Sequence, residues 1–296
     1  MSHEELSIAD PKLEALLERA WQTRVDNFSM TIQFDYPLDT AVISLTGAQC
    51  ALNCAHCGQH YLQHMIPIWE AAERVAETAP SLLISGGCDP EGRVPVMAHL
   101  DKVAALSSGR RLNWHVGLIS ESEAKVIAPY VDVISLDFVG DDETICEVYG
   151  LDKTVADYVA SYQVLQRYAR VLPHITIGLR GGALGHERPA LEQLAKLGLD
   201  GLVFIVFIPT PGTHYADRQP PAVADVVTIL AEARLCFPNK PIYLGCMRPK
   251  GHYRAELDLL AVRAGVNKIV SPTRPAVRLA KDLGLSVVRG RECCAL

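Results

Sequence analysis

Short apolar runs alternate along the chain with longer segments in which apolar residues recur at helical spacing. Runs of this length are typical of buried strands, and the longer amphipathic segments are typical of crossover helices. The alternation therefore predicts a parallel β-sheet that is covered on both faces. The predicted strands are residues 41–45, 81–85, 112–117, 131–136, 174–178, 201–207, 241–245 and 268–271, and the predicted helices include 69–77, 156–168, 188–197, 222–235 and 254–264.

An eightfold strand–helix repeat without a reversal of order closes best into an α/β fold, a (β/α)8 barrel of the TIM type. An open, doubly wound sheet is the alternative. Three parts are expected along the chain. They are an extension over residues 1–38 with a helix and a short strand, the barrel over 39–284, and a tail over 285–296 that begins as a strand.

Composition narrows the class of protein. The chain has 296 residues, 49% hydrophobic and 21% charged, which excludes a disordered chain, a collagen-like repeat and a coiled-coil rod. Its net charge of −6 disfavours nucleic acid as a partner. The longest apolar run, 202–208, is far shorter than the roughly 20 residues of a membrane span. The acidic start, Met-Ser-His-Glu-Glu-Leu-Ser, is unlike a secretory signal, so a soluble cytoplasmic protein is expected.

Nine cysteines are many for a cytoplasmic chain, and metal ligation or redox chemistry explains them better than a disulfide framework. Three of them, Cys50, Cys54 and Cys57, have the spacing C-x-x-x-C-x-x-C. Three thiolates can surround one soft metal centre and leave one position open, as in an iron–sulfur cluster with a free iron. Two alternatives stay open: a structural zinc site completed by His56 or His60, and unrelated buried thiols.

Other residues with chemical potential follow the predicted strands. Active sites of such barrels lie at the C-terminal ends of the strands, so these residues are expected on one face. Each has a structural alternative to a role in the site. Asp137 could cap a helix or form an ion pair, and His115 could be a core histidine. Arg180 and Arg248 could form salt bridges. The full set is Cys88, His115, Asp137, Arg180, residues 209–213, Cys246 and Arg248.

The cysteine spacing, in a loop after the first barrel strand, resembles that of the radical S-adenosylmethionine (SAM) superfamily. The resemblance implies that Cys50, Cys54 and Cys57 hold a [4Fe–4S] cluster and that SAM chelates the fourth iron. An electron from the cluster then cleaves SAM to methionine and a 5′-deoxyadenosyl radical. His56 stands where many members carry an aromatic residue, and it is expected to stack on adenine.

Further motifs resemble the same family in the same order. Ser85-Gly86-Gly87 resembles the element whose backbone receives the methionine ammonium, with Cys88 in place of its glutamate. Residues 175–178 resemble the segment that flanks adenine. Residues 208–213, which include Pro209, resemble an element of the biotin synthase and hydrogenase-maturase branch. The resemblance also implies SAM contacts by Asp137, at the ribose, and by Arg180, at the carboxylate.

The remaining cysteines suggest a second cluster. Biotin synthase and its relatives often carry one, which sulfur-inserting members consume as the sulfur source. The resemblance implies that its ligands come from Cys88, Cys246, Cys293 and Cys294. The alternative for the tail is a disordered segment with two solvent-exposed thiols.

The segment 45–62 resembles a biotin-synthase-related group that includes the paired lipoyl synthases. This implies a radical SAM sulfurtransferase that inserts sulfur into an octanoyl chain on a lipoyl domain or H protein. The implied partners are a second radical SAM subunit and a low-potential ferredoxin or flavodoxin. A hydrogenase-maturase-like or tailoring enzyme that acts on a small molecule is the alternative, and a zinc-stabilised binding protein is the non-enzymatic one.

Overall fold

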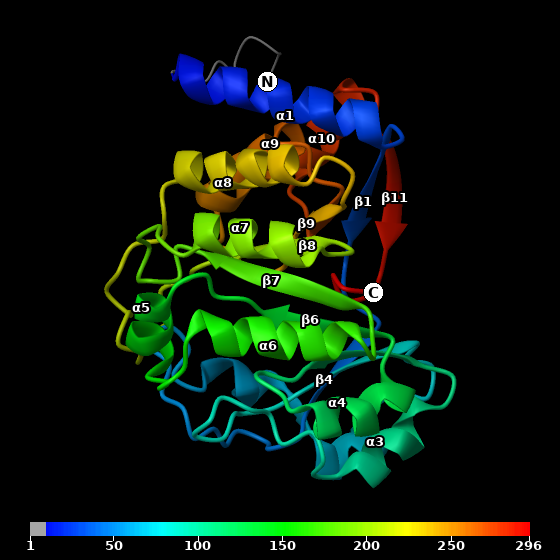
Figure 1. Ribbon diagram of the computed structural model, residues 1–296. Coiled ribbons are helices and arrows are strands. Elements are labelled where there is room, and N and C mark those ends of the chain that lie inside the picture. Colours follow the sequence, from blue (N-terminus) through cyan, green and yellow to red (C-terminus); the bar gives the residue numbers. More distant parts are fainter. Residues whose placement is uncertain (1–9) are drawn as a thin grey trace.

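The computed structural model describes residues 10–296. The acidic start of the chain, on which the absence of a secretory signal was predicted, lies outside the described residues. A single curled parallel sheet forms the centre of the fold, with helices packed along its outside (Figure 1). The predicted α/β class is therefore confirmed. Within residues 10–296, no helix has the length and apolar character needed to cross a membrane.

The sheet has eleven strands in the order β11-β1-β10-β9-β8-β7-β6-β5-β4-β2-β3. The eight predicted barrel strands are β2 and β4 to β10, and they follow one another in chain order as a (β/α)8 fold requires. Their bounds, with those of the added strands, are β1 Thr31–Asp35, β2 Thr40–Ser44, β3 Ile66–Pro67, β4 Ser81–Ser85, β5 Arg111–His115, β6 Val133–Asp137, β7 Val171–Ile177, β8 Leu202–Val206, β9 Ile242–Leu244, β10 Lys268–Val270 and β11 Ser286–Gly290.

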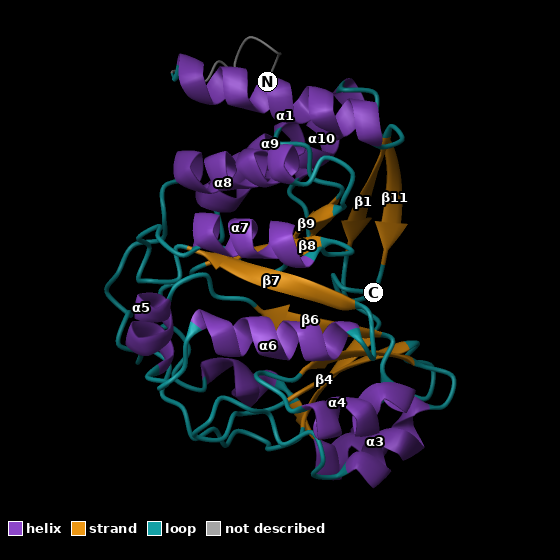
Figure 2. Cartoon of the chain, in the orientation of Figure 1, coloured by secondary structure: helices purple, strands orange, loops and turns teal. Residues whose placement is uncertain are grey.

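The helices lie on the outer face of the sheet, and α1 crosses α8 and α9 at one end (Figure 2). The segment predicted as a helix at 69–77 forms only a 3₁₀ turn, Ile68–Glu70, and a short helix. The bounds are α1 Pro11–Asn27, α2 Ala71–Arg74, α3 Leu100–Ser107, α4 Glu121–Ile127, α5 Asp142–Thr144 followed by a π-helical turn Ile145–Tyr149, α6 Val155–Gln166, α7 Glu187–Leu197, α8 Val223–Cys236, α9 His252–Arg263 and α10 Arg274–Asp282.

The two faces of the sheet differ in chemistry. Side chains that alternate outward along each strand, such as Trp114, Ile134 and Phe204, are apolar and fully buried beneath the helices. The inward positions carry many polar groups, among them Asn113 and His174. The strands are therefore not apolar on both faces as the sequence pattern suggested, because the inner face lines a polar interior.

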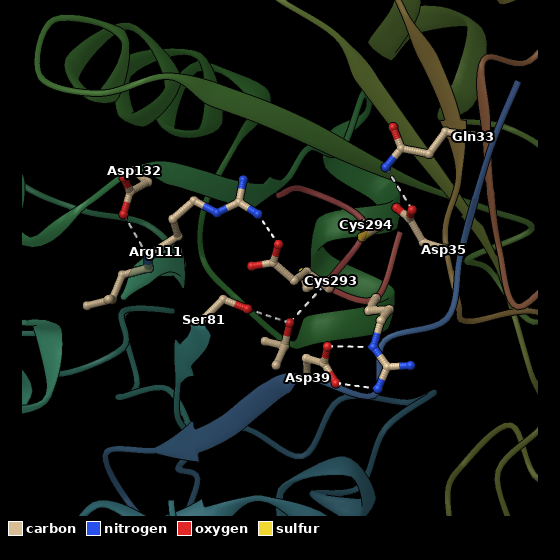
Figure 3. A network of polar contacts seen from close by, with 12 residues as sticks. Gln33, Asp35, Asp39, Ser81, Arg111, Asp132, Cys293 and Cys294 are labelled. Atoms are coloured by element: carbon tan, nitrogen blue, oxygen red, sulfur yellow. Dashed lines mark hydrogen bonds and ion pairs between the residues drawn. The ribbon is translucent and has the colours of Figure 1, made fainter. Parts of the chain in front are cut away.

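The sheet does not close through strand pairing, because β3 and β11 stand at its two ends. Instead, the C-terminal tail crosses from β11 to the start of β2 (Figure 3). Arg291 forms a bidentate ion pair with Asp39, at 2.7 and 2.8 Å. The backbone N–H of Cys293 donates to Thr40 Oγ1 at 2.8 Å, and Thr40 Oγ1 is 2.8 Å from Ser81 Oγ. The tail thus runs from the C-terminal end of β11 to the N-terminal ends of β2 and β5.

Candidate active site

The three-cysteine motif forms a tight loop after β2. The N–H groups of Cys57 and Gly58 both donate to the carbonyl of Cys54 at 3.1 Å, and His60 donates to Cys57 O at 2.9 Å. These turns bring the motif's cysteines together within a short segment. Cys50, Cys54 and Cys57 are all partly exposed.

The glycine loop after β4 packs directly against this cysteine loop. Cys88 N donates to Cys50 Sγ at 3.2 Å, and Ala51 N donates to Cys88 O at 2.7 Å. A Cβ atom on Gly87 would lie 1.9 Å from Gln49 O, so no other residue fits this contact. An open pocket of about 360 Å³ lies between the two loops.

The amide of Gly87, in the predicted glycine element, is already engaged within the protein. Gly87 N–H already donates to Thr46 Oγ1 at 2.7 Å. Its amide therefore holds the loop after β2, and a free ammonium group, itself a donor, would be received by carbonyl oxygens nearby. Ser85, at the end of β4, and Gly86 lie beside this contact, so the whole predicted element faces the cysteine loop.

Two further loops support the cysteine motif from other strands. Ala55 N donates to Val148 O, after β6, at 2.7 Å, and Tyr215 N, after β8, donates to Ala55 O at 2.9 Å. Tyr61 Oη lies 3.2 Å from Thr210 Oγ1, the residue that follows Pro209. The structure therefore brings the element at 208–213 against the cysteine loop.

His56 lies within this packed region. Its ring meets Tyr149 edge-on, with ring centroids 5.7 Å apart. Burial lowers the pKa of His56 to about 4, so the ring is neutral at pH 7. Its Nδ1 is buried without a hydrogen-bond partner. A buried unpaired ring nitrogen is costly, which marks a place for a ligand group.

The pKa values of Cys50 and Cys54 shift in opposite directions. The Cys88 thiol, through its hydrogen bond to Cys50, lowers the pKa of Cys50 to about 6 despite partial burial. Burial, reinforced by the charges of Cys57 and Cys50, raises the pKa of Cys54 to about 12. Cys50 is therefore the first thiolate of the group.

Two predicted anion-binding arginines are engaged elsewhere. Arg180 donates twice to Glu143 at 2.8 Å and once to Glu147 at 3.1 Å, which is the surface ion-pair alternative. Arg248 is fully buried and donates to Asp258 at 2.7 Å and to the carbonyl of Gly245 at 2.6 Å. Neither guanidinium faces the cysteine loop with free donors, so the expected contact of Arg180 with the SAM carboxylate is not supported.

Replacement of Arg248 by methionine is expected to destabilise the fold strongly. Arg248 and Asp258 are both 0% exposed, and the change leaves the carboxylate buried without its partner. The free energy of unfolding should fall by about 3–5 kcal/mol, and the melting temperature by roughly 10 °C. Arg188→Met removes an exposed pair with Glu232 and should cost less than about 1 kcal/mol. Equal melting temperatures for the two variants, measured by circular dichroism, would contradict the assignment.

A group of titratable side chains occupies the interior between β5, β6 and β7. Asp137 is accessible to solvent, yet burial raises its pKa while the charge of His174 opposes the rise. The space inside the curled sheet, which these side chains face, is named the lumen. Asp141, not Asp137, caps the following helix, so the N-cap alternative for Asp137 is wrong.

His174 is a site residue that sequence reasoning missed. Its ring meets that of His115 edge-on, at an interplanar angle of 62° with ring centroids 5.3 Å apart. Burial lowers the pKa of each histidine to about 4. The only sequence signal was a histidine at an inward position of an otherwise apolar strand. The neighbouring Ile175 and Ile177 are fully buried on the outer side, so their side chains do not flank a ligand in the lumen.

The tail cysteines lie at the opposite end of this lumen. Cys293 is 8% exposed, and its Sγ accepts a hydrogen bond from Asn113 Nδ2 at 3.2 Å. Cys294 Sγ lies 3.9 Å from His174 Nε2. Burial raises the pKa of the Cys246 thiol, and the charge of Cys293 adds to the rise. The alternative of a disordered tail with solvent-exposed thiols is wrong.

The four cysteines assigned together from sequence therefore divide in two. Cys88, against Cys50, and Cys246, just beyond the C-terminal end of β9, lie at one end of the strands, whereas Cys293 and Cys294 lie in the tail and are named the floor cysteines. Within residues 10–296, no three His, Cys, Asp or Glu side chains converge on a single metal ion. Thiolates that bind different irons of a cluster do not share such a point.

Comparison with known proteins agrees with this arrangement. No family model matches the chain. Biotin synthase of Neorickettsia sennetsu is 26% identical over 249 residues, which cover 77% of this chain and 74% of that protein. Over these residues the chain is similar to that biotin synthase. The cysteine motif of this chain lies in the loop after β2, the first of the eight barrel strands.

Solved structures show the same fold. Methylornithine synthase superposes with a TM-score of 0.69 at 17% identity and covers 96% of this chain and 92% of its own. The FeFe-hydrogenase maturase HydG from Carboxydothermus hydrogenoformans gives a TM-score of 0.69 at 14% identity, over 95% and 73% of the two chains. These two proteins therefore share the α/β fold of this chain.

Proposed function

We propose that Cys50, Cys54 and Cys57 hold a [4Fe–4S] cluster to which SAM binds at the open iron. The residues present fit this group. Three thiolates of one loop provide the soft ligands, and the Gly87 contact fixes Cys50 at the edge of an open pocket. The unpaired Nδ1 of His56 offers an acceptor to a purine amino group. When bound, the cluster supplies the electron that cleaves SAM.

We further propose that the protein is a sulfurtransferase, one subunit of a two-component lipoyl synthase. The observation that carries this proposal is the position of the floor cysteines across the lumen from the cysteine loop. Cys293 contacts Asn113, which pairs with Leu83 of β4. From Leu83 to Cys88, beside Cys50, the chain advances five residues, roughly 16 Å when extended. A substrate between the groups would meet a radical on one side and a sulfur source on the other.

The lumen also has walls suited to such a substrate. Val133, Leu172 and Val203 are buried and pack with Cys293 into an apolar cluster at the base of the lumen. The neutral imidazoles of His115 and His174 and the carboxyl of Asp137 line the wall above. These groups would orient a chain end without adding a full positive charge.

A tailoring or maturase-like enzyme acting on a small molecule is the second candidate. Polar inward residues such as Ser135 and Asn113 favour it, because an acyl chain makes no use of their hydrogen bonds. This candidate needs the cysteine loop but no sulfur donor on the floor.

The test is a single-turnover assay under anaerobic conditions. The reconstituted protein, SAM and a reductant are mixed with an octanoylated lipoyl domain, with and without the second radical SAM subunit. We expect sulfur in place of hydrogen on the octanoyl chain, detected by mass spectrometry, only when both subunits are present. Formation of 5′-deoxyadenosine without any sulfur in the octanoyl chain, with both subunits present, would exclude the lipoyl synthase proposal and favour the tailoring enzyme.

A further inference from the structure

Four basic side chains line one cavity between α10 and the edge strand β11. Arg274, Arg278 and Lys281 come from α10, and Arg289 comes from β11, which packs against α10. The cavity has a volume of about 340 Å³, and no acidic side chain of residues 10–296 lines it. We call it the cationic cavity.

The four basic groups have no partner of opposite charge. In the part of the chain that the structure describes, none of them takes part in an ion pair or a side-chain hydrogen bond. Arg274 and Arg278 stand four residues apart on α10, and Lys281 follows three residues later, so their charges repel along one helix face. Arg274 is also the first residue of α10, where the helix dipole disfavours a cation, and the first turn holds no acidic residue. A bound anion would relieve both costs.

The chemistry of the cationic cavity is that of a phosphate site. Guanidinium groups bind phosphate oxygens in a bidentate manner, and a lysine ammonium adds a point charge. Three arginines and one lysine around a single cavity match a diphosphate or triphosphate better than a single carboxylate. The net charge of the whole chain is −6, so the cavity is a local reversal of sign and not part of a generally basic surface.

A second cavity, of about 530 Å³, adjoins the cationic cavity, and Tyr36 and Arg289 line both. Leu38 also lines the second cavity and leaves 73% of its surface exposed. An aromatic ring beside an exposed apolar side chain offers a stacking surface to a base. Ser271, in the same lining, has a left-handed backbone with a φ of 49°, a conformation that is rare outside glycine and is found at ligand sites.

We propose that the two cavities together bind a nucleoside di- or triphosphate, with its phosphates among the four basic side chains and its base beside Tyr36 and Leu38. This site is separate from the open pocket beside the cysteine loop, because the two share no lining residue. The inference goes beyond the proposed function and does not depend on it. Gly290 and Arg291, at the start of the tail, also line the second cavity, so a bound nucleotide would stabilise the docked tail.

The test is isothermal titration calorimetry on the reconstituted full chain. ADP, ATP, inorganic pyrophosphate and adenosine are titrated into the wild type and into Arg278→Gln, Arg289→Gln and Arg170→Gln. The last variant is the matched control, because Arg170 is exposed, forms no ion pair within the described residues and lines neither cavity. Circular dichroism verifies that each variant is folded.

We expect one ADP or ATP per chain with a dissociation constant below about 100 μM, weaker binding of pyrophosphate and the weakest binding of adenosine. Arg278→Gln and Arg289→Gln should each weaken ADP binding at least about tenfold, since each removes a charged donor to phosphate. Arg170→Gln should leave the affinity unchanged. Binding should also weaken as the salt concentration rises.

Three results would overturn the inference: no binding of ADP or ATP, ADP binding that is unchanged in both cavity variants, or adenosine binding as tight as that of ADP. Pyrophosphate that binds as tightly as ADP would contradict the contact of a base with Tyr36 and Leu38. Polyglutamate that binds the wild type but not Arg278→Gln, and that ADP does not displace, would identify a protein-docking surface in place of a nucleotide site.

Discussion

Replacement of Cys54 by alanine will reduce the formation of 5′-deoxyadenosine from SAM by at least about a thousandfold, equivalent to roughly 4 kcal/mol of barrier. The cysteine loop supplies its thiolates from one short segment, and the turn at Cys54 O, which receives the N–H groups of Cys57 and Gly58, positions them. Removal of one thiolate leaves an iron of the cluster without its protein ligand. Iron per chain should fall from about eight to about four if a second cluster at the floor cysteines, the floor cluster, is retained.

The matched control for Cys54→Ala is Cys236→Ala. Cys236 is an exposed free thiol at the end of α8, so its loss should change neither iron content nor SAM cleavage. Both variants are assayed after anaerobic reconstitution with dithionite as reductant, and the product is quantified by chromatography. A Cys54→Ala protein that cleaves SAM within tenfold of the wild-type rate would show that the loop does not hold the catalytic cluster.

The double change Cys293→Ala/Cys294→Ala is expected to separate the two chemistries. Sulfur insertion should be lost, whereas SAM cleavage should continue without coupling to product. Iron should again fall from about eight to about four per chain, but through loss of the floor cluster. The tail should stay docked, because its contacts through Arg291, Glu292 and the Cys293 backbone N–H use no thiol.

A second pair of cysteines controls for the loss of thiols as such. Cys146 and Cys236 are both exposed, and their double change to alanine should leave iron content and products unaltered. Circular dichroism before and after reconstitution verifies that each variant is folded. Eight irons retained without Cys293 and Cys294 would contradict the placement of the second cluster on the floor and would favour the tailoring enzyme.

Local patterns were enough to predict the strands. Each strand is a contiguous apolar run, so it can be recognised from residues adjacent in the sequence. The predicted strand at 81–85 has the same bounds as β4. The cysteine motif was equally readable, because its three thiols lie within eight residues of chain. The order of the predicted strands then placed Cys88, Asp137 and Cys246 at one end of the sheet by topology alone.

Pairing between distant segments could not be read from the sequence. Arg180 and Arg248 look alike as cations after strands, and only packing shows that Glu143 and Glu147 engage one and buried Asp258 the other. His174 was hidden for the same reason. Its inward direction depends on strand register, and its importance depends on the tail cysteine beside it.

The sequence by itself determined the class of fold, the three-cysteine motif and the cysteine-rich tail, since these are contiguous patterns. Tertiary structure decided where the tail goes. Contacts such as Asn113 with Cys293 join residues 180 positions apart, and they form because an open sheet leaves a gap that Asp39, Thr40 and Arg111 close with tail partners. That closure places the thiols of Cys293 and Cys294 inside the barrel. Cys88 stays at the other end, where the glycine loop packs against Cys50.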